Sequence, residues 1–418
     1  MTKITKVIGR QVFDSRGNPT VEAEVFLKNK IKASAIVPSG ASTGAFEACE
    51  LRDNNKDYFL GKSVLNAVKN INTIINKSLK NEDTRKQKKI DQILLDLDGT
   101  ENKNKLGANA LLAVSLAVAK AEAISKKKEL YQHLGKKFIL PMPLMNIING
   151  GAHADNNLRV QEFMIRPDSA INFMDAIEKG FLVIQNLKKI LQSKNFLINV
   201  GDEGGFAPAI NSNEEALDLI IEAIKKSKLK PGIDVNICLD VAANELINKE
   251  GKYSLNSDKF ISVDESITYY KNLVSNYPII SIEDPFAEDD WDAWSKLTKE
   301  IGKKVQIVGD DLFVTNVNRL KRGIKEKSAN SILIKVNQIG TLTETLDVID
   351  LAKKNNFGTI ISHRSGDTED TFIADLSVAT QSTQIKTGSL ARSERVAKYN
   401  RLLRIEEQLG KSSKIARI

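Results

Sequence analysis

The chain has 418 residues, of which 41% are hydrophobic and 27% charged, and its formal net charge is +8. This length exceeds what one small core needs, so we expect two domains of unequal size, and the composition excludes a disordered or disulfide-rich protein. The positive charge admits a nucleic acid or an anionic small molecule as partner. Because the lysines are dispersed along the sequence, a solvated basic surface is favoured over a nucleic-acid site.

The first third of the sequence predicts a small α+β domain over residues 1–133. Alternating apolar residues predict a three-stranded antiparallel meander, with strands at 4–14, 20–27 and 31–37. Helical spacing follows at 64–79, 84–97 and 108–124. The apolar run at 110–119 is about half as long as a membrane span, so we expect a buried helix and no membrane insertion. A proline-containing linker is predicted at 135–144.

The remainder, residues 140–418, alternates short apolar runs with helix-like stretches. Strand–helix units at this period predict parallel strands, and the length allows a closed eight-stranded α/β barrel of the TIM type. The carboxyl ends of such strands carry the active site. Six runs end in polar residues that we expect to converge: Asp240, Glu283, Asp310, Lys335, the segment 363–365 and Lys386.

Three of these strand ends supply carboxylates with no accompanying cysteine. Asp240, Glu283 and Asp310 therefore predict a hard divalent cation, Mg²⁺ or Mn²⁺, rather than zinc. Each acid alone is more typical of a helix cap or a solvated surface. The three together at matched strand ends indicate a metal site.

Lys335 follows the buried run "SILI" without a break, which is costly unless the ammonium group has a use. A base acting near neutral pH needs a lysine pKa lowered by about three units. Burial, divalent cations and the neighbouring Arg364 and Lys386 would all lower it. A salt bridge to one of the carboxylates is the alternative, and both states can hold before a substrate arrives.

Anion recognition is predicted nearby. Arg364, Ser365 and Lys386 suit a pocket for phosphate and carboxylate groups. Glu203, in the turn-rich "VGDEGGFAP", can act as a general acid if its pKa is raised, or else only stabilise the turn. His153 and His363 lie in loops that we expect to meet the substrate, whereas His133 reads as structural.

These motifs together resemble the enolase family (phosphopyruvate hydratases) of bacterial type. The resemblance covers residues from about 5 to 408 and keeps the motif order. Its most specific segments are "DSRGNPTVE", "SGASTG", "NIINGGAHADNN", "QEFMI", "GDEGGFAP", "LDVAANE", "SIEDPF", "GDDLFVTN", "LIKVNQIGTLTET", "SHRSGDTEDTFIADL" and "QIKTGSLARSERVAKYN".

The resemblance implies reversible dehydration of 2-phospho-D-glycerate to phosphoenolpyruvate. Lys335 matches the base that removes the C2 proton, and Glu203 the acid that protonates the departing hydroxyl. The other matches concern binding: His153, Gln161 and Glu162 for the substrate, Arg364 and Ser365 for its phosphate, Lys386 for its carboxylate, and Asp240, Glu283 and Asp310 for one Mg²⁺ with Ser42 for a second.

The resemblance also implies a barrel that begins with two antiparallel strands, and a homodimer or octamer. It implies a cytoplasmic location, with display at the cell surface or secretion without a signal peptide as a further option. The chain departs from the common family pattern at Ala152, at Asp367 and over 377–384, and in its basic charge. None of these positions has a chemical role assigned above.

Two other functions stay open at this point. One is a related enzyme acting on a non-phosphorylated carboxylate, such as a racemase or cycloisomerase, which would lack "SHRSG" and "GDEGGFAP". The other is a non-catalytic protein of the same fold that binds RNA or protein through its basic surface. A retired enzyme would be expected to have lost Lys335, Glu203 or a metal ligand, and all are present.

Overall fold

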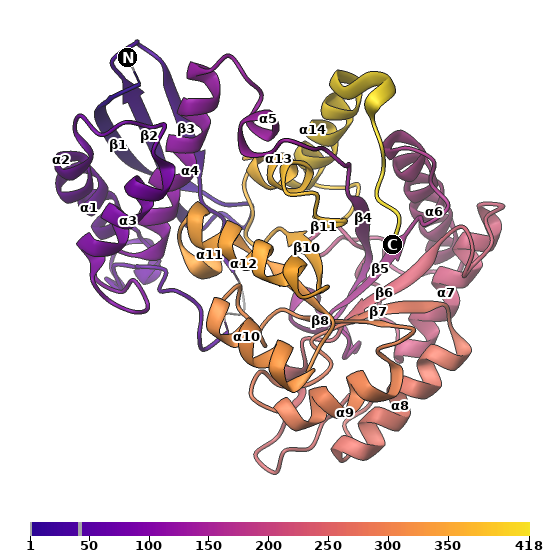
Figure 1. Cartoon of the computed structure of the whole chain (residues 1–418). Coiled ribbons are helices and arrows are strands. Elements are labelled where there is room, and N and C mark those ends of the chain that lie inside the picture. The colour runs from indigo at the N-terminus through magenta and orange to yellow at the C-terminus, as the bar shows by residue number, and fades with distance from the viewer. Residues whose placement is uncertain (1, 41–43) are drawn as a thin grey trace.

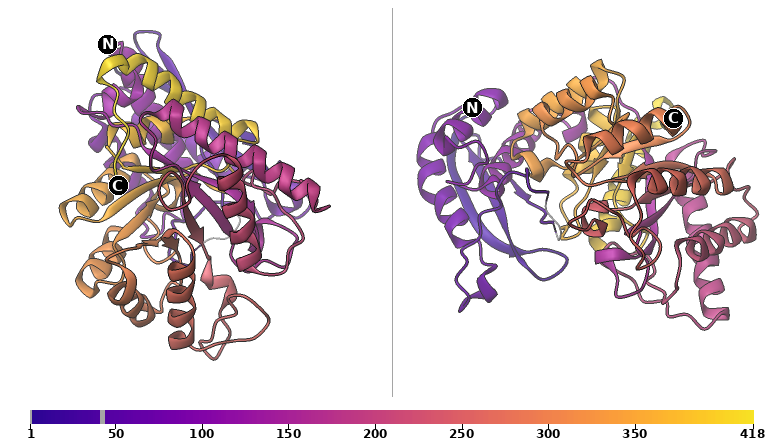
Figure 2. Two further views of the ribbon diagram at one scale, coloured as in Figure 1. Left: turned by 90° about the vertical axis from the view of Figure 1, so that its right-hand side faces the viewer. Right: turned by 90° about the horizontal axis from the view of Figure 1, so that it is seen from below.

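The computed structural model describes residues 2–40 and 44–418. A small α+β body at the N-terminus lies beside a larger barrel, and the two bodies are seen side by side in two directions (Figures 1 and 2). Ser42, which the sequence predicted as a metal ligand, lies outside the described residues.

The N-terminal sheet contains β1 (Ile4–Phe13), β2 (Pro19–Leu27) and β3 (Lys32–Ile36), paired antiparallel in that order. This confirms the predicted meander. Asp14 closes the first turn, because its Oδ1 accepts the backbone N–H groups of Arg16 and Asn18 at 2.8 and 2.9 Å. Gly17 in this turn has a φ of 73°, a conformation that glycine adopts without steric cost.

One helical rod, with a wide π turn in its middle, covers the outer edge of β1. It consists of α1 (Leu65–Asn70), η2 (Ile71–Ile75) and α2 (Asn76–Leu79), and follows the short η1 (Phe59–Gly61). Asn72 and Asn76 accept the backbone N–H groups of Gly9 and Val7, each at 2.8 Å. The side chains thereby pair N–H groups that a free strand edge would expose.

The other helices of this body are α3 (Gln87–Asp98), α4 (Ala108–Ser125) and α5 (Leu130–Leu134). α3 begins three residues later than predicted, because Thr84 bonds to the Thr2 carbonyl at 3.0 Å and to Glu122 instead of entering the helix. α4 is long and apolar enough to span a membrane, but 83% of it is buried. It packs on β2 and β3, so it is the core helix of this body.

Eight strands close the barrel in the order β10-β11-β4-β5-β6-β7-β8-β9. The strands are β4 (Met142–Asn149), β5 (Glu162–Arg166), β6 (Asn236–Asp240), β7 (Ile279–Glu283), β8 (Gln306–Gly309), β9 (Ser331–Ile334), β10 (Gly358–Ser362) and β11 (Gln384–Lys386). β5 runs antiparallel to both of its neighbours, and every other pair is parallel. The eight-stranded barrel is confirmed, and its irregular start agrees with the resemblance rather than with the all-parallel pattern.

β4 begins inside the segment predicted as a linker, so that prediction was too long. Pro143 lies within the strand opposite Ile385 of β11. The prolines were read as turn signals, but the fixed φ of proline also fits extended backbone. The connecting segment therefore ends at Pro141.

Helices surround the barrel on its outside (Figure 1). They are α6 (Phe173–Ser193), α7 (Asn213–Lys226), α8 (Val263–Asn276), α9 (Trp291–Ile301), α10 (Val317–Glu326), α12 (Leu342–Lys354), α13 (Phe372–Ala379) and α14 (Ser393–Leu409). The short elements in the connections are α11 (Val336–Ile339), η3 (Gly151–His153), η4 (Ala243–Leu246) and η5 (Gly410–Ser412). Several helices begin at a side-chain cap; in α8, Ser262 and Glu265 form a capping box.

A small apolar cluster fills the barrel interior, separate from the main core. Its members come from six strands: Leu144, Met164, Cys238, Val308, Leu333 and Ile360. This layer is the floor on which the polar residues at the strand ends lie.

Candidate active site

The strand ends bring polar side chains to one mouth of the barrel, and the period of the strands explains how. Alternate residues of a strand point to the same side, so Asp240 and Lys335 point inward like Cys238 and Leu333, which lie two residues earlier in the floor layer. In β5 the order is reversed: Glu162 precedes the floor residue Met164 because this strand runs the other way.

Most of the predicted site residues line a single pocket at this mouth. They are His153, Gln161, Glu162, Glu203, Asp240, Asp310, Lys335, Arg364, Ser365 and Lys386. Glu283 joins them through its ion pair with Lys386. The convergence inferred from the sequence is therefore present for all of the described candidates, while their chemical roles stay predictions.

Lys386 lies at the centre of an acidic cluster. Its Nζ is 2.8 Å from Asp240 Oδ2, 2.9 Å from Glu283 Oε1 and 3.1 Å from Glu162 Oε1. Burial lowers the pKa of Lys386, but these carboxylates outweigh burial and raise it well above its usual value. Burial and the charge of Asp240 raise the pKa of Glu283.

Lys335 forms an ion pair with Asp310, the alternative that the sequence left open. Gln338 donates to the other oxygen of Asp310 at 3.0 Å. Burial lowers the pKa of Lys335 and is the largest single effect, but the Asp310 and Glu283 carboxylates together leave that pKa raised.

Two glutamates and a histidine make a second acidic group. His153 Nδ1 lies 3.7 Å from Glu162 Oε1 and 3.8 Å from Glu203 Oε1. Burial and the Glu203 charge raise the pKa of Glu162 well above its usual value. Glu162 is therefore the carboxyl group of the two whose charged form is disfavoured.

The raised pKa that a general acid requires is not found at Glu203. Burial raises its pKa, but the His363 and His153 imidazoles and the Arg395 guanidinium outweigh burial and hold it well below its usual value. The pKa of His363 itself is lowered to about 4, chiefly by burial. Its ring is then neutral at pH 7, and a neutral imidazole contributes to Glu203 only as a dipole or donor, so we assign the permanent charge to Arg395.

The anion side of the pocket is built on Arg364. Its NH1 and NH2 lie 2.8 and 3.2 Å from the two oxygens of Glu47, a residue of the N-terminal body. NH1 also donates to Asn337 Oδ1 at 3.2 Å. Burial lowers the pKa of Arg364, but Glu47 outweighs burial and raises it.

The donor set fits hard divalent cations. Six buried carboxylates gather at this mouth, from Glu162, Glu203, Asp240, Glu283, Asp284 and Asp310, against the two lysines. Among the residues that the structure describes, Glu162 Oε2 is buried and has no hydrogen-bond partner. A cation held by these oxygens would offset repulsion that now raises the pKa values of several of them.

The predicted metal trio of Asp240, Glu283 and Asp310 is not among the groups whose ligand atoms lie within 4.8 Å of one another; Lys386 pairs with the first two and Lys335 with Asp310. Two other groups have ligand atoms within 4.8 Å of one another: His153 with Glu162 and Glu203, and Asp284 with Asp310 and Asp311. Asp284 accepts the backbone N–H groups of Asp310 and Asp311, each at 2.9 Å. Burial and Asp310 raise the pKa of Asp311 to about 7.

Comparison with known proteins agrees with this geometry. The family model "Enolase, C-terminal TIM barrel domain" matches residues 137–417, and "Enolase, N-terminal domain" matches residues 4–134. A relative from Pelagibacter ubique (strain HTCC1062), named Enolase, is 61% identical over 420 residues that cover 100% of both chains. The chain belongs to the enolase family.

Sequence reasoning missed several residues of this enolase-family site. Glu47, Gln338 and Arg395 all touch a predicted site residue. Asp284 and Asp311 were also missed, although the sequence contained a signal for them. In "IEDPF" and "GDDLF" a second acid directly follows a predicted ligand. Glu47 and Arg395 carried no comparable signal, since their contacts join distant parts of the chain.

Proposed function

We propose that this chain catalyses the reversible dehydration of 2-phospho-D-glycerate to phosphoenolpyruvate, as the family membership supports. One observation carries the proposed chemistry. Lys335 follows β9, and Glu162, which contacts the same histidine as Glu203, opens β5. β9 and β5 lie four places apart in the eight-membered strand order, so the two groups face each other across the barrel.

This arrangement suits removal of a proton on one side of a substrate and loss of a hydroxyl on the other. Lys335 is the proposed base for the C2 proton, and Glu203 the proposed acid for the hydroxyl. Lys335 can accept a proton only as a neutral amine. The Asp310 carboxylate, which now stabilises the ammonium form, must therefore bind another cation, such as the predicted Mg²⁺. For Glu203 to donate a proton, it must first be protonated, against the neighbouring groups that now hold its pKa low.

The remaining residues are proposed to bind the substrate. Arg364 and Ser365 would take its phosphate, and Lys386 its carboxylate, because guanidinium and ammonium groups suit those anions. His153 and Gln161 complete the pocket, and Gln161 already donates to Asp240 at 3.4 Å. The buried walls exclude bulk water, which strengthens each of these charge interactions.

We further propose two Mg²⁺ ions per site. Asp240, Glu283 and Asp310 would hold one, and Ser42 would contribute to the other. When bound, the cations would stabilise the negative charge that develops on the substrate carboxylate after proton removal. The excess of buried acids over lysines supports this proposal.

A homodimer, with an octamer as the alternative, is proposed for the assembly. Exposed aromatic and aliphatic side chains support it: Phe13, Tyr58, Phe59 and Leu60 are 52%, 46%, 39% and 85% exposed. The Phe13 and Phe59 ring centroids lie 5.7 Å apart, so these side chains form one cluster. Light scattering of the wild type and of Leu60→Asp tests this assignment; a wild-type monomer contradicts it.

We propose domain boundaries at 1–133 and 140–418, and a cytoplasmic location with surface display or secretion as a further option. A non-catalytic binding role through the basic surface gains no support from the family comparison. The deciding experiment follows phosphoenolpyruvate formation from 2-phosphoglycerate by ultraviolet absorbance, with Mg²⁺ and then with excess chelator. Metal-dependent turnover supports the proposal, and no turnover in a folded, Mg²⁺-supplied sample contradicts it.

A further inference from the structure

Glu47 pairs with the arginine that is proposed to receive the substrate's phosphate. The pair is bidentate and buried, with side-chain exposures of 8% for Glu47 and 3% for Arg364. A carboxylate in this position presents two oxygens to a guanidinium, as a phosphate does. The Glu47 carboxylate therefore lies against the guanidinium that is proposed to bind the phosphate.

The backbone around Glu47 is held to the barrel independently of this ion pair. The Ala45 N–H donates to Glu288 Oε2 at 3.2 Å, and the Ala48 N–H donates to the Gln338 carbonyl at 2.8 Å. Between them, the Phe46 ring lies 4.0 Å from the guanidinium carbon of Arg319. The Glu47 side chain also accepts the Gly44 N–H at 3.1 Å, so a change there removes that one backbone contact while the contacts of Ala45 and Ala48 remain.

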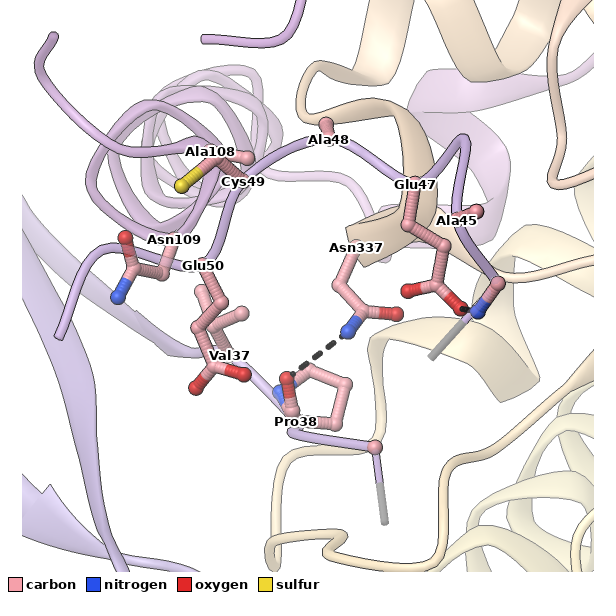
Figure 3. A pocket seen from close by; sticks show the side chains of 12 residues that line it. Val37, Pro38, Ala45, Glu47, Ala48, Cys49, Glu50, Ala108, Asn109 and Asn337 are labelled. Atoms are coloured by element: carbon pink, nitrogen blue, oxygen red, sulfur yellow. Dashed lines mark hydrogen bonds between the residues drawn. The ribbon is translucent and has the colours of Figure 1, made fainter. Parts of the chain in front are cut away.

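A cavity beside Glu47 can accommodate its side chain once it leaves Arg364. The cavity has a volume of about 390 Å³ and lies between the N-terminal body and the barrel. Figure 3 shows Glu47 and Asn337 on one side of it, and Glu50 and Asn109 on the opposite side. Asn109 and Asn337 each donate one amide N–H to a backbone carbonyl, and the second N–H of each amide can bond a carboxylate that turns away from Arg364.

We propose that Glu47 is an internal competitor for the substrate's phosphate, which must displace the Glu47 carboxylate from Arg364 to bind. The inference rests on the proposed function, since it takes Arg364 as the phosphate-binding residue. A phosphate dianion and the Glu47 carboxylate repel each other when both lie against one guanidinium. The affinity of the pocket for phosphorylated ligands is therefore lower than it would be without the Glu47 carboxylate.

Displacement of Glu47 would also affect Asp310, through the side-chain amide of Gln338. Gln338 Nε2 donates to Glu47 Oε1 at 3.3 Å and to Asp310 Oδ1 at 3.0 Å. When Glu47 leaves, this amide can turn wholly to Asp310, the partner of Lys335. Phosphate arrival is therefore coupled to the surroundings of the proposed base.

Calorimetric titration with phosphoenolpyruvate in the presence of Mg²⁺ tests the proposal. Glu47→Gln keeps the shape of the side chain but removes its charge, so it should bind about tenfold more tightly than the wild type, the factor for one charge-assisted bond. Glycerate, which has no phosphate, should bind both proteins equally. Glu47→Ala is the second variant. It should bind phosphoenolpyruvate more tightly than the wild type even if the glutamine of Glu47→Gln still occupies Arg364.

Glu50→Gln is the matched control, because Glu50 lines the same cavity and pairs with Arg52 rather than Arg364. Its phosphoenolpyruvate affinity should equal that of the wild type. Equal or weaker binding by both Glu47 variants overturns the inference, as does equal tightening by Glu50→Gln. Failure of the proposed function is distinguishable, since the wild type itself would then neither bind phosphoenolpyruvate nor turn over.

Discussion

Arg395 NH1 lies 2.5 Å from His363 Nδ1, and both side chains are buried. An arginine N–H can only donate, so Nδ1 accepts and the proton of the neutral ring is on Nε2. That nitrogen faces Glu203, 3.3 Å from Oε2. Arg395 thus sets the tautomer of His363, and through it the environment of the proposed acid.

Replacing Arg395 with glutamine should raise the pKa of His363 above about 4, because a neighbouring cation and a donor to Nδ1 are removed. NMR titration of the imidazole signals measures this directly, since the chain has 3 histidines. Arg392→Gln is the control: Arg392 bonds to Glu394 and Ser15 and should leave the pKa of His363 unchanged. An unshifted His363 in a folded Arg395→Gln protein would refute the assignment.

His363 should also make the protein less stable in acid. Its pKa is about 4 in the folded chain, against an ordinary unfolded value of about 6.5. As the pH falls through this window the unfolded chain binds a proton that the folded chain does not. The free energy of unfolding should therefore decrease, by roughly 3 kcal/mol in full.

Urea unfolding at several pH values between these limits tests the acid effect. His363→Asn removes the titrating group, so its midpoint should fall less between pH 6.5 and pH 4 than the wild-type midpoint does. Parallel curves for the two proteins would contradict the argument. The two proteins are compared by how steeply the urea midpoint changes with pH, not by absolute stability, because a chain with two bodies need not unfold in one step.

The sequence predicted the barrel and the convergence of its site from two regularities. Strand–helix units recurred along the chain, and runs such as "SILI" were followed directly by an ionisable residue such as Lys335. Periodicity has no direction, however, so it did not reveal that β5 runs backwards and offers Glu162 from its first residue. That detail came from the resemblance alone.

Charge environments were harder to predict than positions. Asp310 and Lys335 follow neighbouring strands, and the register between β8 and β9 decides that they form an ion pair. The sequence contains each residue but not that register, so it left open whether Lys335 pairs with a carboxylate. Glu47 meets Arg364 across 317 residues, a separation at which local patterns carry no information.

Lys335→Ala should abolish exchange of the C2 proton of 2-phosphoglycerate with solvent, because no other group is proposed to remove it. Loss of a base that accelerates proton transfer costs at least about 10²-fold. Mg²⁺ binding should persist, since Asp310 loses its ion-pair partner and becomes more available. Deuterium incorporation by NMR and Mg²⁺ titration by calorimetry measure the two effects.

An exposed lysine supplies the control for that substitution. Lys321→Ala, on the outer face of α10, removes the same charge far from the pocket and should exchange at the wild-type rate. Retained exchange in Lys335→Ala would remove this residue as the base. Loss of Mg²⁺ binding together with exchange would instead make it a structural partner of Asp310.

Glu203→Gln separates the two halves of the proposed reaction. The amide cannot give a proton to the departing hydroxyl, so dehydration should slow by about 10²-fold or more. Lys335 lies across the barrel and should still remove the C2 proton, so solvent exchange continues without net turnover. The amide also removes one of the negative charges near Glu162, which should lower the raised pKa of Glu162. Equal loss of exchange and turnover would show that one group serves both steps. That result would contradict the assignment of Lys335 as the base and Glu203 as the acid.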